Sequence, residues 1–156
     1  MPAMPWTGSF GSSGSPELKI RISGVVGEGA EFAAIIDTGF TGFLSMPLVE
    51  AFPLGLLLFG TMNLVLADGS TSFRLTGYGT ITVEGEKQNG VIVLEPASGE
   101  VLIGMEFLKR FNKTLVVVPG TSVVLLDLPP PAVPPAAPAA QPGPAGPAGE
   151  PPAESN

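Results

Sequence analysis

The residues of this chain best suited to catalysis form a short polar turn after an apolar run. Residues 35–39 read Ile-Ile-Asp-Thr-Gly, so Asp37 is followed by a hydroxyl group, Thr38, and then by bare backbone, Gly39. A carboxylate held on a tight turn is suited to general acid–base chemistry, because a fixed side chain can take and return a proton at one place. The tripeptide is short, so its meaning depends on the elements that the rest of the chain provides around it.

The composition excludes several other kinds of chemistry. The chain has no cysteine and no histidine, which removes cysteine nucleophiles, Ser-His-Asp triads, disulfides and nearly every zinc site. We therefore expect no metal and no other cofactor. Fourteen acidic residues face seven basic ones, for a net charge of −7, and without a basic stripe nucleic acid is not an expected partner. Lys109, Arg110 and Lys113 do cluster, but cations near a helix C-terminus complement its dipole, and we prefer that interpretation to an anion site.

The ends of the chain differ in composition from its middle. Residues 1–16 are rich in Gly, Ser and Pro, and we expect a flexible N-terminal segment. Residues 17–128 form the predicted folded domain. Residues 129–156 are mostly Pro and Ala, too poor in bulky apolar residues to build a core, which predicts a disordered, polyproline-like tail. Such a tail could be a ligand for aromatic grooves or a spacer, and its low complexity favours the spacer.

Two features bear on location. The N-terminus lacks a basic region followed by an apolar run, so no signal peptide is expected, and the absence of cysteine fits a cytoplasmic protein. Residues 51–67 carry no charge and just reach the length that spans a membrane. Because Pro53, Gly55, Gly60 and Asn63 interrupt this stretch, we expect no span and favour buried strands in an apolar dimer.

Alternating apolar and polar residues predict a mostly β domain. A strong turn signal, Asp68-Gly69, joins two of the strands into a hairpin, and a further turn is expected at residues 85–90. One helix is expected at residues 106–111, with a single helical turn at 47–52 that Pro53 ends. The pattern indicates a small barrel, closed or partly open. The expected strands are 18–23, 31–36, 62–67, 71–83, 91–94, 101–104, 114–118 and 122–126.

Three separated features together resemble a retroviral-type (clan AA) aspartic protease. They are residues 35–42, Ile-Ile-Asp-Thr-Gly-Phe-Thr-Gly; the Asp68-Gly69 hairpin; and residues 102–104, Leu-Ile-Gly, followed by a helix. More narrowly, the chain looks like the bacterial and archaeal group whose active-site motif reads Asp-Thr-Gly-Phe. The resemblance covers about residues 18–126 and implies a retropepsin-like (acid-protease) β-barrel with one short C-terminal helix.

The resemblance implies an aspartic endopeptidase, a hydrolase in which two carboxylates share one proton across a water molecule. The chain has three aspartates, Asp37, Asp68 and Asp127, and Asp37 is the one in an Asp-Thr-Gly turn. The active form is therefore expected to be a homodimer in which each copy contributes Asp37. The implied partners are a second copy of the chain and a peptide or protein substrate.

The resemblance also assigns supporting roles. Thr38 would brace the two turns across the dimer axis, while Gly39 and Gly104 would let backbones approach closely. The hairpin of residues 64–73 would fold over the substrate as a flap. Its implied substrate-binding residues are Leu66, Ala67, Asp68, Gly69 and Ser70.

Phe40 departs from the commonest pattern of the family, in which a small residue follows the glycine. Phe40 cannot donate a hydrogen bond to Asp37, and its ring is large enough to fill part of the cleft, so we count it among the substrate-binding residues. A filled cleft would favour a second hypothesis, a non-catalytic peptide-binding or dimerisation module on the same fold.

Overall fold

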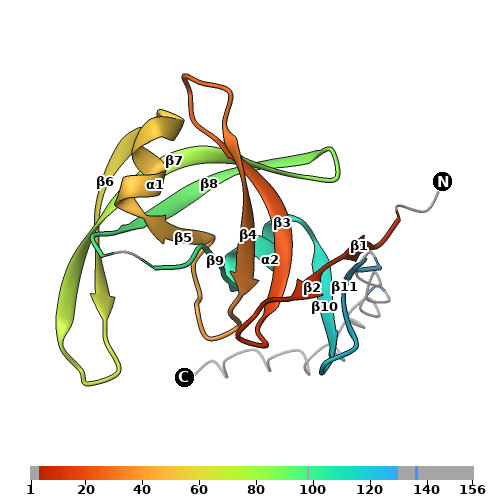
Figure 1. Cartoon of the computed structure of the whole chain (residues 1–156). Coiled ribbons are helices and arrows are strands. Elements are labelled where there is room, and N and C mark those ends of the chain that lie inside the picture. The colour runs from red at the N-terminus through yellow and green to blue at the C-terminus, as the bar shows by residue number, and fades with distance from the viewer. Residues whose placement is uncertain (1–3, 98, 130–135, 137–156) are drawn as a thin grey trace, which may run out of the picture.

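The computed structural model describes residues 4–97, 99–129 and 136 of the chain, and these residues form a β-rich domain (Figure 1). Two short helices, α1 (Leu48–Ala51) and α2 (Met105–Arg110), and a 3-10 turn, η1 (Phe52–Leu54), interrupt the strands. The strands are β1 (Trp6–Thr7), β2 (Ser9–Phe10), β3 (Pro16–Ser23), β4 (Ala30–Ile36), β5 (Leu44–Pro47), β6 (Leu57–Val65), β7 (Thr71–Val83), β8 (Glu86–Glu95), β9 (Leu102–Ile103), β10 (Lys113–Val118) and β11 (Ser122–Asp127).

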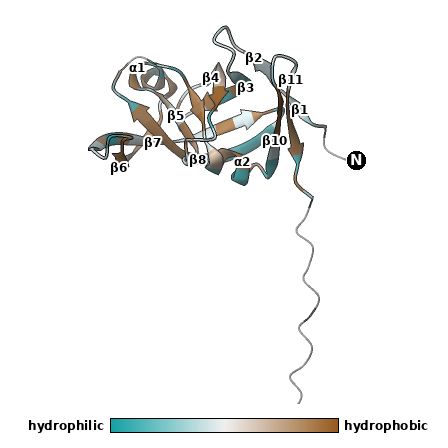
Figure 2. Ribbon diagram, turned by 90° about the horizontal axis from the view of Figure 1, so that it is seen from below, coloured by the Kyte–Doolittle hydropathy of each residue, from teal (hydrophilic) through white to brown (hydrophobic). Residues whose placement is uncertain are grey.

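The strands form two sheets. The larger has eight strands in the order β2-β3-β4-β9-β5-β8-β7-β6, and the smaller has three in the order β1-β11-β10. β3 also pairs with β7 over residues 21–23, so the larger sheet curls back on itself into a partly open barrel. The β6–β7 hairpin and the small sheet lie at opposite ends of the molecule (Figures 1 and 2). The predicted fold class, mostly β with a partly open barrel, is confirmed.

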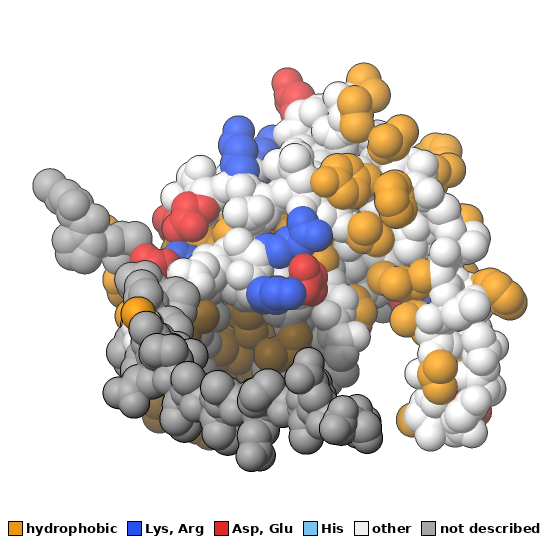
Figure 3. Space-filling model, turned by 180° about the vertical axis from the view of Figure 1, so that it is seen from behind, with side chains coloured by type: hydrophobic (Ala, Val, Ile, Leu, Met, Phe, Trp, Pro, Cys, Tyr) orange, Lys and Arg blue, Asp and Glu red, His pale blue; other side chains and the backbone are white. Residues whose placement is uncertain are grey.

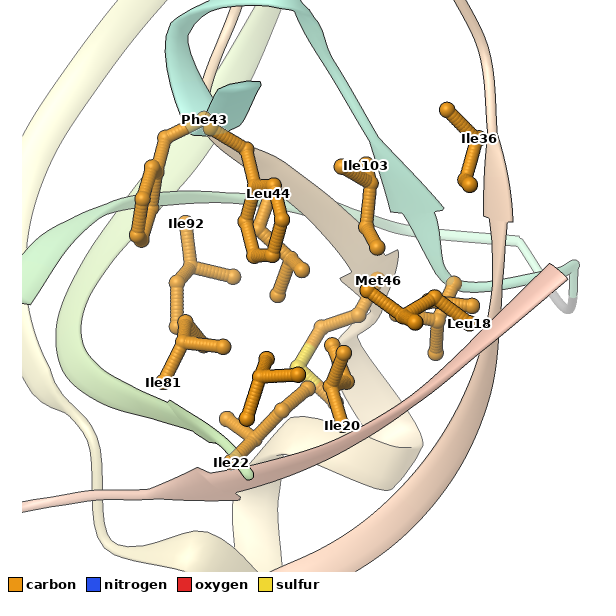
Figure 4. Close-up of a cluster of buried hydrophobic side chains, with 14 of the residues drawn as sticks. Leu18, Ile20, Ile22, Ile36, Phe43, Leu44, Met46, Ile81, Ile92 and Ile103 are labelled. Atoms are coloured by element: carbon orange, nitrogen blue, oxygen red, sulfur yellow. The ribbon is translucent and has the colours of Figure 1, made fainter. Parts of the chain in front are cut away.

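The core lies inside the curled sheet and follows from the alternation in the sequence. In β3, Leu18, Ile20 and Ile22 are buried while Lys19 and Arg21 are exposed, as the period of two predicts. Colouring by hydropathy shows apolar residues along most of the strands, with hydrophilic ones on α2 and at the tip of the β6–β7 hairpin (Figure 2). The side chains that meet at the centre include Ile20, Ile22, Leu44, Met46, Ile81, Ile92 and Ile103 (Figure 4).

Part of the N-terminal segment that was expected to be flexible, residues 1–16, pairs with the folded domain in the structure, at residues 6–7, 9–10 and 16. Trp6 is 2% exposed, pairs with Leu125 of β11, and packs edge-on against Phe111 with ring centroids 5.1 Å apart. β2 adds a further pairing to β3. These strands are two residues long and have no alternation of their own, so the distant partner strand stabilises them. The tail predicted for residues 129–156 lies outside the described residues, apart from Pro129 and Ala136.

The uncharged stretch at residues 51–67 does not form buried strands within one chain. It contains η1, which includes Pro53, so the helical conformation continues past the end predicted at Pro53. It also contains β6, whose residues are exposed almost throughout. Hydrophobic side chains gather on this part of the surface (Figure 3), where Phe52, Leu58 and Phe59 are exposed. Within residues 4–97 and 99–129, no helix is long and apolar enough to cross a membrane.

Two further differences concern β5 and β8. β5 was not predicted, because its four residues are all buried and show no alternation. β8 begins at Glu86, so the turn predicted for residues 85–90 is wrong for residues 86–90. The turn that joins β7 to β8 consists of Glu84 and Gly85, both with positive φ. The predicted C-terminal helix is present as α2, and Phe107, Leu108 and Phe111 are buried on one side of it.

The basic cluster divides into two parts. Lys109 and Arg110, near the end of α2, pair with Glu106 one turn earlier. Lys113 instead starts β10 with a fully buried side chain. Its Nζ lies 3.0 Å from Glu86 Oε1 and 2.5 Å from Asp127 Oδ1, so the helix-dipole interpretation is wrong for this residue.

Candidate active site

Asp37 lies directly after β4, at the start of the loop that leads to β5. Its backbone amide donates to the carbonyl of Ile103 at 2.9 Å, which continues the parallel pairing of β4 with β9. Its carboxylate turns back on the loop, and Oδ1 accepts a 2.9 Å hydrogen bond from the Gly39 amide. Asp37 is half-buried. Asp37 is therefore a carboxylate at the end of a strand, oriented by a backbone hydrogen bond and accessible to solvent.

Gly104 lies directly beneath this loop. Its amide donates to the Phe43 carbonyl at 3.2 Å, and the next amide, of Met105, donates to the Phe40 carbonyl at 2.8 Å. A Cβ at position 104 would lie 2.1 Å from the Gly42 carbonyl oxygen, closer than atoms in contact can approach. The two segments touch backbone to backbone, which explains why glycine occupies position 104.

Thr38 and Gly39 form the exposed part of the turn. A Cβ on Gly39 would lie 3.2 Å from Asp37 Oδ1, so a side chain there would crowd the carboxylate. Thr38 is at the rim of an apolar groove whose other lining residues include Met105, Leu108, Leu115 and Leu128. The structure thus brings Asp37, Thr38, Gly39 and Gly104 together at one place.

Phe40 is half-buried, and its ring packs on its own loop. The atoms nearest to a Cβ built on Gly42 belong to this ring, the closest being Phe40 Cζ at 2.4 Å. A Cβ on Gly104 would also meet the ring, at 2.7 Å from Phe40 Cδ1. Both glycines therefore border the aromatic ring.

The tip of the β6–β7 hairpin is a compact turn held by local hydrogen bonds. The amide of Leu66 donates to the Ser70 carbonyl at 2.8 Å, and Gly69, with a φ of 82°, donates to the Leu66 carbonyl at 2.9 Å. Asp68 Oδ1 accepts from the Ser70 hydroxyl at 2.6 Å and from the Ser70 amide at 2.9 Å. These bonds to the ionised form lower the pKa of Asp68 below its ordinary value of 3.8. Ala67 is exposed in the same turn.

The hairpin tip and the Asp37 loop extend toward the same side of the molecule (Figure 1). No hydrogen bond between residues that the structure describes joins Asp37 to residues 66–70. The Asp37 turn and the hairpin tip are thus two separate elements.

Two apolar residues beside Asp37 lie in the motifs quoted from the sequence, but no substrate-binding role was expected for them. Ile35 and Leu102 are paired across β4 and β9 and are both half-buried. Since side chains along a strand alternate between faces, Ile35 is on the same face as Asp37, opposite the buried Ile36 and Ile103. The period of two could have indicated Ile35, but Leu102 required knowledge of the β4–β9 pairing.

The chemistry open to this site is that of a carboxylate. Across residues 4–97 and 99–129, no group of three or more His, Cys, Asp or Glu side chains could hold a metal ion. Asp127 is paired with Lys113, and Asp68 is in the hairpin tip, so neither lies beside Asp37 within the chain.

Comparison with known proteins gives a match in structure. No protein-family model matches the chain, and no curated protein matches its sequence. A crystal structure of a retropepsin-like aspartic protease from Rickettsia conorii superimposes with a TM-score of 0.55 at 15% identity, over 78% of this chain and 89% of that one. The EIAV protease, complexed with the inhibitor HBY-793, gives a TM-score of 0.52 at 14% identity, over 70% of this chain and 99% of that one.

At such identities the likeness shows the fold. The chain has the retropepsin-like β fold of retroviral and bacterial aspartic proteases.

Proposed function

We propose that this protein is an aspartic endopeptidase that acts as a homodimer and belongs to the group with the Asp-Thr-Gly-Phe motif. The observation that carries the proposal is the placement of Asp37. It is a solvent-accessible carboxylate on a turn held by the Gly39 amide, at the end of a strand of a retropepsin-like fold.

The proposed reaction uses two Asp37 carboxylates that share one proton around a water molecule. The ionised carboxylate removes a proton from the water while the water oxygen attacks the peptide carbonyl carbon. The protonated carboxylate gives its proton to the carbonyl oxygen, which yields a tetrahedral intermediate. The carboxyl group that took the proton from the water then gives it to the leaving nitrogen, while the other carboxylate takes a proton from one hydroxyl of the intermediate. The C–N bond breaks, which releases a carboxylic acid and an amine and returns the pair to one shared proton. Because Asp68 and Asp127 are engaged elsewhere in the chain, the second carboxylate comes from a second copy.

The proposed dimer face contains Thr38 and the apolar groove beside it. β10 is an edge strand of the small sheet, and Val116, Val117 and Val118 at its end are partly exposed. A second copy placed against this groove would cover apolar surface and bring its own Asp37 turn toward the first. The two-fold symmetry of such a contact gives both carboxylates the same surroundings.

The proposed substrate is an extended peptide with apolar side chains. Among the described strands β6 is at the edge of the larger sheet, where a peptide could add as a further strand, and the β6–β7 hairpin would close over it. Ile35 and Leu102 provide an apolar surface next to Asp37 for a side chain beside the cleaved bond.

The decisive comparison is between the wild type and Asp37→Asn in cleavage of a peptide library at several pH values. Asn keeps the oxygen that accepts from Gly39 but cannot act as a base, so cleavage falls to background while the fold is retained. Glu31→Gln, an exposed carboxylate change on the same strand, is the matched control and keeps full activity. Equal cleavage by the wild type and Asp37→Asn would contradict the proposal.

The solution mass and the turnover, measured together, separate the dimeric enzyme from a non-catalytic peptide-binding or dimerisation module. We expect a dimer at working concentration and inhibition by a statine-type transition-state mimic. A stable monomer would leave Asp37 without its partner carboxylate. Peptide affinity that Asp37→Asn leaves unchanged, with no turnover by either form, would support the binding module instead.

A further inference from the structure

The Phe40 ring occupies a space that two glycines leave open. Cβ atoms built on Gly42 and Gly104 would lie 2.4 Å from Phe40 Cζ and 2.7 Å from Phe40 Cδ1, so the ring passes over both positions. No residue with a side chain at position 42 could coexist with the ring where it is. The ring is thus seated against the loop and against the start of α2.

The backbone of Phe40 is held at the same place. Its amide donates to the Asp37 carbonyl at 3.1 Å, and its carbonyl accepts from Met105, the first residue of α2, at 2.8 Å. Phe40 therefore connects the turn that carries Asp37 to the helix behind it, through both backbone groups and the ring.

The Asp37 carboxylate has little other support from side chains. Within the described part of the chain, the hydrogen bond to the carboxylate comes from the Gly39 amide, and no hydroxyl group reaches it. Its orientation thus depends on the shape of the turn, against which the Phe40 ring is packed.

We propose that Phe40 is a positioning residue: its ring, seated over Gly42 and Gly104, locks the Asp37 turn to α2 in the geometry that catalysis needs. This inference rests on the proposed function, and it replaces the idea that the ring blocks the cleft. Small displacements of a catalytic group cost large factors in rate, so loss of the ring acts on turnover more than on substrate binding.

The packing is tested by a stability cycle that needs no activity. Gly42→Ala in the wild type forces the ring aside and lowers the folding equilibrium constant by about tenfold. In the Phe40→Ala background the same change costs less than about threefold, because the obstructing ring is gone. Gly104→Ala is the matched control, since its nearest obstacle is the Gly42 carbonyl oxygen, and Phe40→Ala does not rescue it. Equal costs of Gly42→Ala in both backgrounds would overturn the proposed seating.

The positioning role is tested by steady-state kinetics at a temperature where all variants are folded. Phe40→Ala lowers kcat by about tenfold or more with KM within about twofold, and Phe40→Leu, which keeps apolar bulk, recovers most of kcat. Phe32→Ala is the control for lost stability, because Phe32 is a half-buried aromatic residue packed on the core, and it keeps kcat.

Three results would refute the positioning role. One is a kcat that Phe40→Ala leaves unchanged or raises, and another is an effect confined to KM or to the preferred substrate residue. The third is a wild type without turnover, which refutes the proposed function and the positioning role of Phe40 together, while the stability cycle still decides the packing.

Discussion

Gly104 passes so close to Gly42 that a single added carbon would overlap the backbone, with Cβ 2.1 Å from the Gly42 carbonyl oxygen. Because a backbone atom cannot rotate away as a side chain can, we predict that Gly104→Ala lowers the free energy of unfolding by about 3 kcal/mol or more. Gly99→Ala is the control, since no described atom lies within 4 Å of a Cβ there. Denaturant unfolding of both variants gives the comparison, and equal midpoints would contradict the close contact.

The sequence predicted the elements that have a local signal. Alternation of apolar and polar residues indicated β3 and β7, and Asp68-Gly69 indicated the β6–β7 hairpin. It did not predict β5, which is buried on both faces and so has no period, nor β1 and β2, whose partners are distant in sequence.

The candidate site was predictable to a similar degree. The type and order of residues 37–39 indicated the turn, because a short polar sequence after an apolar strand has a local meaning. The seat of the Phe40 ring was not predictable, since it depends on the separation between the loop and Gly104, which the pairing of β4 with β9 sets. The buried position of Lys113 depends likewise on carboxylates from two other elements.

Lys113 provides a second prediction. Its buried ammonium contacts Glu86 and Asp127 and lies 4.1 Å from the centre of the Trp6 ring. Replacement by Met removes these contacts, but both carboxylates are partly exposed and regain water, so we expect a loss of about 2 kcal/mol in the free energy of unfolding. Lys109→Met is the control, because its side chain is 80% exposed and its ion pair spans 3.8 Å, and it changes stability by less than about 0.5 kcal/mol.

The pH dependence of this contribution follows from the pKa of Lys113. Burial of the ammonium lowers that pKa, but hydrogen bonds to Asp127 and Glu86 and their charges outweigh burial, so the pKa is raised above 10.5. The stabilisation is therefore complete below about pH 10.5 and is lost as the pH rises through the raised pKa. The stability difference between the wild type and Lys113→Met should be constant from neutral pH to about 10 and shrink above that, and a difference that shrinks toward acid near neutral pH would contradict the assignment.

Trp6 gives the third prediction, which concerns the N-terminal segment. The indole is buried between β11 and the aromatic side of α2, with Phe107 and Phe111 at centroid distances of 6.4 and 5.1 Å. Trp6→Ala should lower the free energy of unfolding by about 3–5 kcal/mol. Met4→Ala, at a residue 84% exposed, should stay within about 0.5 kcal/mol. Thermal and denaturant unfolding would test this. Equal stability of the two variants would support the expectation that the N-terminal segment is flexible.

The hairpin tip gives the last prediction, on the Asp68–Ser70 contact. The Ser70 hydroxyl and then the Ser70 amide donate to Asp68 Oδ1 and lower the pKa of Asp68 below 3.8, so this local structure is complete above about pH 3.8 and is lost as the pH falls through the lowered pKa. Ser70→Ala removes the larger contribution, the hydroxyl, while the amide remains, and we expect the pKa of Asp68 to rise toward 3.8.

An NMR titration of the Asp68 carboxyl group measures this pKa directly. Ser72→Ala, two residues further along the chain in β7, is the control that leaves the pKa of Asp68 unchanged. A pKa that does not move in Ser70→Ala would show that the hydroxyl does not hold the tip closed in solution, and the compact turn would then rest on the Leu66–Ser70 and Gly69–Leu66 backbone bonds.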